Sequence, residues 1–324
     1  MSSIACRSFR GALFTFSAFA LALPALANHG PGTSGGGSST ASGETLKQGL
    51  FDVSLRTDYT EFEHISEAEA IQRALASGSF DGLSRAFVTT LSAAYGATND
   101  LQVGAQIGYY AGTNFIAADS DGMGGVDVGT ADPAGLTDMW LNGKWRVMHG
   151  KPGNLAVLFG LKLPTGRDNV LLSNGEKLEA SSQPGTGAFD GQLGVAYSRF
   201  LTSRLTLDAS FAYTLRGTHD DFTVGDRIDT GLALAYRLTE DIRKFPNYSL
   251  SAELLDVFIG KDDDHGALNP NSGGNTLYLS PGFRTRFDEH TALSLAAALP
   301  VAQGLNGDQI ETRFKAAVTL SFGF

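Results

Sequence analysis

Residues 310–324 decide the fold, and they read IETRFKAAVTLSFGF. The even-numbered positions are mostly apolar, whereas the odd-numbered ones include Glu311, Arg313 and Lys315. Successive side chains of a β-strand point to opposite faces, so one face of this strand is apolar and the other is charged. The stretch also exceeds the roughly 9 to 11 residues that a tilted transmembrane strand needs. The pattern predicts a strand with lipid on one side and a polar interior on the other.

The same two-residue period recurs along most of the chain. Short connectors and longer ones alternate between the segments, as periplasmic turns and outer loops do in bacterial barrels. We therefore predict an all-β fold, a transmembrane antiparallel up-and-down β-barrel of about twelve strands spanning residues 49–324. The expected strands are 49–61, 84–96, 100–111, 136–147, 155–164, 187–200, 204–216, 226–238, 247–260, 275–287, 291–300 and 309–324.

The amino terminus indicates export. Arg7 and Arg10 precede an uncharged apolar run over 11–23, and Ala25-Leu26-Ala27 has the form of a signal-peptidase site. The run is too short to span a membrane, so we predict a cleaved signal peptide over residues 1–27. Together with the barrel pattern, this signal favours the Gram-negative outer membrane.

Composition excludes two classes of protein. The chain carries a formal charge of −10, which argues against nucleic acid as a partner. Its mean hydropathy is −0.04 and no apolar run is long enough for a membrane helix, so a helical membrane bundle is excluded. A barrel remains compatible because half of each strand faces water.

Residues 28–48 are mostly Gly, Ser and Thr, so they cannot form a core of their own. We expect a flexible periplasmic leader, with a plug threaded into the barrel as the alternative. A short helix is expected in the first outer loop, where Ser66 and Glu69 form a capping box and Gly78 ends the turn. This helix would either close the mouth as a lid or rest on the rim.

The polar faces of the strands supply candidates for a lumen lining. They would select solutes by charge, or pair with one another in a narrow bore. Strand closure suggests that Asp52 and Asp58 face Arg313 and Lys315. The candidates are Asp52, Arg56, Asp58, Lys144, Arg146, Lys162, Asp208, Arg216, Asp229, Arg237, Glu253, Arg284, Arg286, Glu311, Arg313 and Lys315.

The outer loops are acidic, but a metal site is only weakly indicated. Asp119-Ser120-Asp121-Gly122 resembles the start of a calcium loop, yet the distal glutamate is missing at the required spacing. Asp262, Asp263 and Asp264 beside His265 form a second weak candidate. We expect no cofactor, and consider divalent cations that bridge these loops to lipopolysaccharide phosphates.

Nothing in the sequence forms a recognisable catalytic motif. The six histidines fall in the leader, in turns, or in and beside outer loops, and no Gly-x-Ser-x-Gly elbow joins an expected strand to a helix. We therefore predict that the protein is not an enzyme. An outer-membrane lipid-modifying enzyme is kept as an alternative, because catalytic geometry cannot be read from one sequence.

One motif resembles a known family. The run comprises Gly160, Leu161, Lys162, Leu163, Pro164, Thr165 and Gly166, and it is followed by a Gly-rich loop. This run is similar to one in the outer-membrane transporter family named for the meta-cleavage (MetA) pathway of phenol degradation. The closing strand, which ends on Phe324, likewise resembles that of outer-membrane barrels read by the barrel assembly machinery. The resemblance implies passage of small, often aromatic or hydrophobic, compounds.

We therefore predict a passive outer-membrane channel or facilitator for small organic compounds. The alternatives are a lipid-modifying enzyme and a structural barrel whose lumen is filled. The expected partners are outer-membrane lipid and lipopolysaccharide, the barrel assembly machinery and a small-molecule solute, but no nucleic acid.

Overall fold

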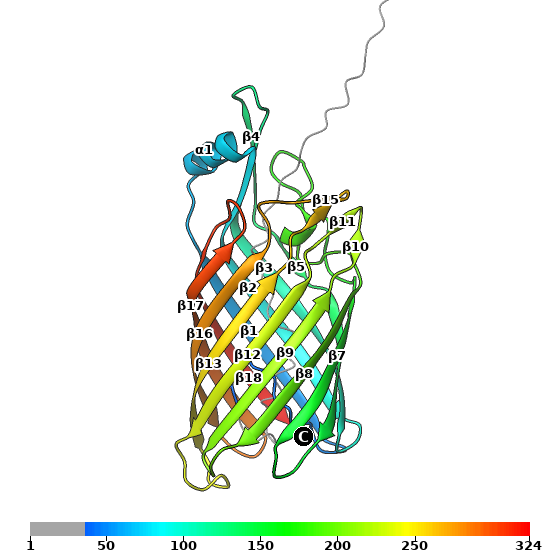
Figure 1. Ribbon diagram of the computed structural model, residues 1–324, viewed down its shortest axis with the longest axis vertical. Coiled ribbons are helices and arrows are strands. Elements are labelled where there is room, and N and C mark those ends of the chain that lie inside the picture. The colour runs from blue at the N-terminus through cyan, green and yellow to red at the C-terminus, as the bar shows by residue number, and fades with distance from the viewer. Residues whose placement is uncertain (1–35) are drawn as a thin grey trace, which may run out of the picture.

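The computed structural model describes residues 36–324, which form a closed antiparallel barrel (Figure 1). The barrel is closed because β2 pairs with both β1 and β3, and β1 pairs with β18. It has twelve strands, as predicted. The barrel strands are β1 (Phe51–Phe62), β2 (Ser79–Gly96), β3 (Leu101–Ser120), β6 (Met139–Met148), β7 (Asn154–Leu163), β8 (Asp190–Phe200), β9 (Leu205–Leu215), β12 (Arg227–Arg237), β13 (Asn247–Ile259), β16 (Gly274–Arg286), β17 (Thr291–Leu305) and β18 (Thr312–Gly323).

Smaller elements decorate the end with the long loops, opposite the C-terminus (Figure 1). Two short strands pair with the extended β3, and four two-residue strands form a separate sheet. These elements are β4 (Val126–Ala131), β5 (Ala134–Leu136), β10 (Thr218–His219), β11 (Phe222–Thr223), β14 (Asp263–Asp264), β15 (Ala267–Leu268), the helix α1 (Glu67–Ser77) and the 3-10 turn η1 (Ala180–Ser182). Among residues 36–324, no helix is long and apolar enough to cross a membrane.

The outer surface has the lipid-facing character that the alternation predicts. Leu232, Leu234, Leu250 and Leu254 are among the large apolar side chains exposed on it. Aromatic pairs mark two levels of the barrel. The ring centroids of Phe51 and Tyr95 lie 4.5 Å apart near the short turns. Those of Tyr59 and Phe87 lie 4.8 Å apart toward the long loops. The aromatic rings sit where rings of outer-membrane barrels contact the membrane interfaces.

The barrel closes between β1 and β18 as expected, but its register differs from the predicted contacts. Asp58 stands opposite Ala317, and Thr60 stands opposite Lys315. A bulge follows, because Glu61 pairs with Phe314 and Phe62 pairs with Thr312. The extra residue reverses the alternation, since a shift of one residue exchanges the two faces of a strand.

The bulge overturns part of the predicted lumen lining. Glu311 and Arg313 are exposed, so neither belongs to the lumen. The expected contacts of Asp52 and Asp58 with Arg313 and Lys315 are also wrong. Asp58 instead binds Arg56 on its own strand at 2.7 Å, and the Lys315 ammonium lies over the Tyr278 ring, 4.7 Å from its centroid.

The helix in the first outer loop is confirmed with its caps. Ser66 Oγ accepts a hydrogen bond from the Glu69 amide, and Gly78 ends the helix with a φ of 96°. Ala70 and Ala74 are fully buried against the outer ends of β2 and β3. The helix therefore rests on the rim and does not cover the mouth (Figure 1).

Candidate functional site

Residues 36–46 lie inside the barrel and are called the plug here. Thr40 is 1% exposed, Ser42 is 0% and Leu46 is 2%. The expectation of a flexible periplasmic leader is therefore wrong for this part, and the alternative of a plug holds. A segment of small polar residues cannot build a core, but a polar bore can satisfy its backbone groups. Residues 1–35, with the predicted signal peptide and the start of the leader, lie outside the described residues.

The upper end of the plug is bound by the buried carboxylate of Glu253 on β13. The backbone N–H groups of Ser38 and Thr40 donate to it at 2.5 and 2.7 Å, and the Thr40 hydroxyl donates at 2.8 Å. The Ser39 N–H donates as well, at 3.1 Å. Successive N–H groups that converge on one anion form a nest, so the plug supplies the hydrogen-bond donors that stabilise this buried carboxylate.

The opposite wall holds the same part of the plug. The guanidinium of Arg56 donates to the Ser38 carbonyl at 2.8 Å while it binds Asp58 at 2.7 Å. Gly37 fits only because it lacks a side chain, since a Cβ there would lie 2.2 Å from the Glu253 carboxylate. Both walls of the bore therefore contact the plug directly.

The lower end of the plug is bound by groups nearer the short turns. Ser198 Oγ accepts from the Gly43 N–H at 2.7 Å, and Lys144 Nζ donates to the Glu44 carbonyl at 3.1 Å. The Leu46 N–H donates to the side chain of Gln102 at 3.1 Å. A cavity of about 30 Å³ remains beside residues 39–41, at the upper end of the plug, and is enough for about one water.

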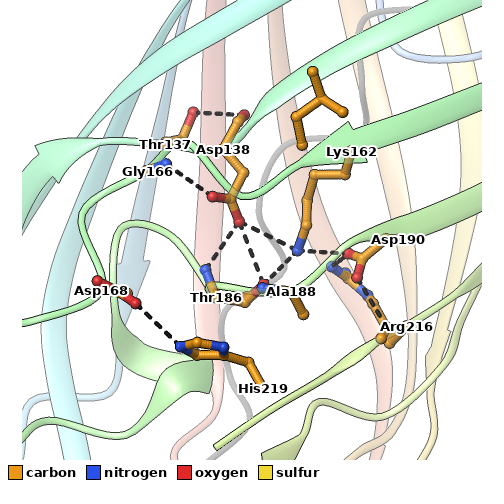
Figure 2. A network of polar contacts seen from close by, with 12 residues as sticks. Thr137, Asp138, Lys162, Gly166, Asp168, Thr186, Ala188, Asp190, Arg216 and His219 are labelled. Atoms are coloured by element: carbon orange, nitrogen blue, oxygen red, sulfur yellow. Dashed lines mark hydrogen bonds and ion pairs between the residues drawn. The ribbon is translucent and has the colours of Figure 1, made fainter.

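A second polar cluster lies at the mouth, where β7 and β9 end and β8 begins (Figure 2). Lys162 Nζ lies 2.7 Å from the Asp190 carboxylate, 3.3 Å from Asp138 and 2.5 Å from the Thr186 hydroxyl. Arg216 reaches the same Asp190 at 2.8 Å. We call these five residues the mouth network. Lys162 and both carboxylates are nearly inaccessible to solvent, so their charges are balanced within the protein.

The Gly160–Gly166 motif builds this network. Lys162 enters it from β7, and the Gly166 N–H donates to Asp138 at 2.9 Å. Thr165 Oγ1 accepts from the Met139 N–H at 2.9 Å, which ties the end of β7 to the start of β6. A Cβ on Gly166 would lie 2.7 Å from the Asp138 nitrogen, so this close approach requires glycine. The motif thus fixes the base of the loop over 164–189.

That loop packs against the outer ends of the barrel strands. Its apolar residues Val170, Leu172 and Leu178 are buried in one cluster with Phe115 and Ile310. A cavity of about 230 Å³ opens between this loop and the small sheet, and we call it the vestibule. It is lined by Asp168, Lys177, Leu178, Glu179, Ala180, Thr186, His219, Asp220, Phe222 and Asp264.

Charged groups dominate the polar part of the vestibule. His219 Nε2 lies 3.4 Å from both Asp168 and Asp220, and Lys177 lies 3.3 Å from Asp220. Burial raises the pKa of Glu179 well above its ordinary value, and the nearby carboxylates of Asp81 and Asp262 raise it further. The surroundings of Glu179 in the vestibule therefore favour its protonated form.

Other residues of the predicted lumen lining lie at two levels of the barrel. Asp52, Asp208, Asp229 and Arg284 are buried inside the bore, with Asp229 bound to Arg227 at 2.7 Å. Arg146, Arg237 and Arg286 lie nearer the short turns, where they contact Asp100, the Ser203 carbonyl and the Phe245 ring.

The predicted lumen lining omitted Asp138, Asp190 and Arg227, although all three lie within the predicted strands. Their places in the alternation point inward, as those of Lys144 and Asp229 do, so this signal could have found them.

The described residues contain no group of three or more His, Cys, Asp or Glu side chains arranged to hold a metal. Asp121 accepts hydrogen bonds from the N–H groups of Met123 and Gly125 in its own turn. Asp262 accepts from the Gly225 N–H, and Asp264 binds the ring of His265 at 2.6 Å. Elsewhere on the outer rim, His64 Nδ1 lies 3.3 Å from Ser84 Oγ.

Comparisons with known proteins agree with this architecture. The model of the family described as "Putative MetA-pathway of phenol degradation" matches residues 30–303. The fold is similar to the COG4313 outer membrane channel from Pseudomonas putida F1, with a TM-score of 0.58 and 15% identity over 87% of this chain and 97% of that one. No curated protein sequence matches the chain.

Two other solved barrels are more distant. The translocator domain of the autotransporter NalP from Neisseria meningitidis has a TM-score of 0.46 and 12% identity, over 86% of this chain and 89% of that one. The toluene transporter TodX from P. putida has a TM-score of 0.40 and 11% identity, over 85% of this chain and 90% of that one.

Proposed function

The chain belongs to the family described by the MetA pathway of phenol degradation, and we propose that it is a passive outer-membrane channel or facilitator. Its solutes would be small organic compounds, including aromatic and hydrophobic ones. Family membership supports the class of solute, and the barrel supports the location. No covalent chemistry is required, because the lumen would replace part of the solute's hydration.

The observation that carries this proposal is the way in which the bore is filled. The wall facing the plug is built from small residues, including Ala156, Ala196, Gly231 and Ala233, and the plug occupies the space that they leave. The plug is held by hydrogen bonds and packing along one segment of the chain. Withdrawal of this segment would leave a polar bore, because a barrel of this size exceeds one filled by its own side chains.

The vacated bore would suit solutes that combine an apolar body with one polar group. Arg56, Lys144 and Arg284 would offer donors, whereas Asp208 and Glu253 would offer acceptors. A phenol or a carboxylated aromatic ring can exchange hydrogen bonds with both kinds of group. The cations of the wall would favour the anionic forms of such compounds.

Deletion of the plug tests this function. We expect the purified wild-type protein to show low conductance in planar bilayers and the variant lacking residues 36–46 to show a larger one. Liposomes that contain the variant should swell in benzoate and phenol. In the matched control, a free peptide with the sequence of the eleven deleted residues is added to the variant. This peptide should reduce the conductance again. Absence of conductance and of swelling in both proteins would reject the channel.

A structural barrel with a filled lumen is the second candidate, and the small residual cavity of about 30 Å³ favours it. In that case, deletion of the plug would lower thermal stability without creating conductance. The lipid-modifying enzyme has one pair to test, His64 and Ser84. Release of fatty acid from lipid by the wild-type protein, abolished by Ser84→Ala, would favour the enzyme.

The same proposal extends to the surface partners. The exposed acidic residues Asp220 and Asp221, with the half-buried Asp263, would bind lipopolysaccharide phosphates through divalent cations. Phe324, which pairs with Phe51 through backbone hydrogen bonds of 2.9 and 3.0 Å, would be read by the barrel assembly machinery. Removal of divalent cations with EDTA should release bound lipopolysaccharide, and truncation of Phe324 should slow assembly in cells.

A further inference from the structure

The barrel wall is not uniform, because the backbone ladder between β17 and β18 stops early. The pairing runs from Thr291 opposite Phe322 to Ala298 opposite Lys315. Beyond that point β17 continues to Leu305 and stays paired with β16, whereas β18 stays paired with β1. The two strands therefore separate toward the long loops. We call this unpaired part, formed by 299–305 and 312–314, the seam.

Local sequence explains why the ladder stops. Pro300 has no backbone N–H to donate to a neighbouring strand. The strand also bulges, because Leu277 pairs with Ala302 and Tyr278 with Pro300, which leaves Val301 extra. Arg313 forms the second bulge on the facing strand. Each bulge bends its own strand and disrupts the pairing locally, and the ladder between β17 and β18 stops next to both.

The other side of β17 is weakened just below the seam. Its pairing with β16 skips from Leu299 opposite Leu279 to Ala296 opposite Gly282. The skipped residues of β16 include Pro281, a second proline without a donor. At the seam, β17 is therefore paired only with β16, and just below the seam it is paired only with β18. Fewer hydrogen bonds resist the displacement of β17 over this part of the barrel.

A side chain replaces the missing ladder. Gln303 Nε2 donates to the Thr312 carbonyl at 3.1 Å, and Gln303 Oε1 accepts from the Thr312 N–H at 2.9 Å. The amide of Gln303 therefore imitates one backbone unit and bridges the seam. Because this bridge depends on side-chain torsions, it can open without unfolding either strand.

Apolar surfaces lie on both sides of the seam. On the lumen side, Leu255, Val257 and Tyr278 form a buried cluster against which Ala298 packs. On the outer side, Leu299 is 48% exposed and Val301 56%. The lumen cluster follows Glu253 on the same wall, and the upper end of the plug lies beside it. An apolar molecule at this cluster would meet the plug on one side and the seam on the other.

We propose that the seam is a lateral portal, through which a small apolar or aromatic molecule passes between the lumen cluster and the outer leaflet of the membrane. The Gln303 amide closes the portal and opens it by rotating away from Thr312. An aromatic ring fits the inner side, where the ammonium of Lys315 already lies over the ring of Tyr278. This portal rests on the proposed function, since it gives the solute of that channel a second route.

A disulfide across the seam tests the portal. The chain has a single cysteine, Cys6, which is replaced by serine, and Leu299→Cys is combined with Phe314→Cys. These positions come next in the register after Ala298 and Lys315. Uptake of radiolabelled toluene and phenol is measured in cells that carry the protein. Oxidation should lower the rate of toluene uptake, and reduction should restore it.

The matched control places the disulfide two residues lower, with Ala297→Cys and Ala316→Cys. These two residues are partners in the intact part of the same ladder, so their oxidation should leave uptake unchanged. Unchanged toluene uptake after oxidation of the seam pair would overturn the portal alone. Uptake by wild-type cells no faster than with the empty vector would overturn both the portal and the proposed channel.

A second variant does not depend on disulfide formation. Gln303→Ala removes the bridge and should raise the rate of toluene uptake, while the thermal stability of the barrel changes little. Gln309→Ala, in the adjacent loop, removes an amide that bonds the Gly273 carbonyl and serves as the control. Unchanged or slower uptake by a folded Gln303→Ala protein would contradict the portal.

Discussion

The mouth and the bore both contain buried charged side chains, but these side chains find their partners in different parts of the chain. At the mouth, Lys162 is balanced by Asp190, the first residue of β8, and by Asp138, which directly precedes β6. In the bore, Glu253 and Lys144 are satisfied by backbone groups of the plug. The charged side chains of the mouth network are therefore paired without the plug, whereas Glu253 and Lys144 in the bore use the plug as their partner. The mouth network is suited to a fixed structure, and the bore is suited to release of the plug.

The largest expected effect comes from breaking the mouth network. Lys162→Met removes the cation shared by two buried carboxylates, so we expect a loss of about 3–5 kcal/mol in the free energy of unfolding. Thermal unfolding followed by heat-modified gel migration measures this loss. Lys177→Met is the control, because its pair with Asp220 is exposed and contributes about 1 kcal/mol or less. Equal effects of the two substitutions would contradict the comparison.

Glu253→Ala attacks the plug at its upper end and should have a smaller effect on stability. The substitution removes the acceptor of the N–H groups of Ser38 and Thr40, at an expected cost of about 1.5–3 kcal/mol. Conductance in planar bilayers should rise as the plug is released. Glu240→Ala, at an exposed turn, should change neither quantity. Loss of stability without any conductance would favour a structural role for the plug.

Lys144→Met tests the lower end of the plug. It removes one hydrogen bond, from Nζ to the Glu44 carbonyl, so we expect a cost of about 1 kcal/mol. Faster hydrogen exchange should be confined to the amides of residues 43–46. Exchange that increases equally in the loop over 164–189 would show that the two regions are coupled and would contradict their independence.

The smallest expected effect concerns pH at the vestibule. The pKa of Glu179 is raised in the folded loop by burial and by nearby carboxylates. The protonated form is therefore favoured, and its stabilising contribution is complete below the ordinary pKa of glutamate and is lost as pH rises through the raised value. Protection of the loop over 164–189 should therefore fall as pH rises above the ordinary pKa of glutamate and toward the raised pKa of Glu179. Glu179→Gln should make this fall shallower, as measured by limited proteolysis.

Much of the barrel follows from local sequence alone. Each strand lies close to its predicted segment, because an alternation of apolar and polar residues needs no distant partner to be read. The strands β2, β3 and β17 extend further than expected toward the long loops. At those ends the alternation fades, and packing against α1 and the outer loops replaces lipid as the reason for strand structure.

The candidate site was predictable only in part. The charges of Asp52, Lys144, Asp208 and Glu253 could be assigned to the inner face by their position in the alternation. Their partners could not, because the bonds between the plug and Glu253 join residues more than 200 positions apart. The bulge at Arg313 was also invisible, since one inserted residue looks the same in the sequence as regular alternation.

The sequence by itself determined a closed barrel with twelve strands, a lipid-facing surface and a polar interior, because these depend on a period of two residues. Only the tertiary structure decided that residues 36–46 fill the bore, that Lys162 is shared by Asp138 and Asp190, and that the wall is unpaired beside Gln303. These features depend on which segments meet across the barrel. That choice is set by register, burial and hydrogen-bond satisfaction between distant residues.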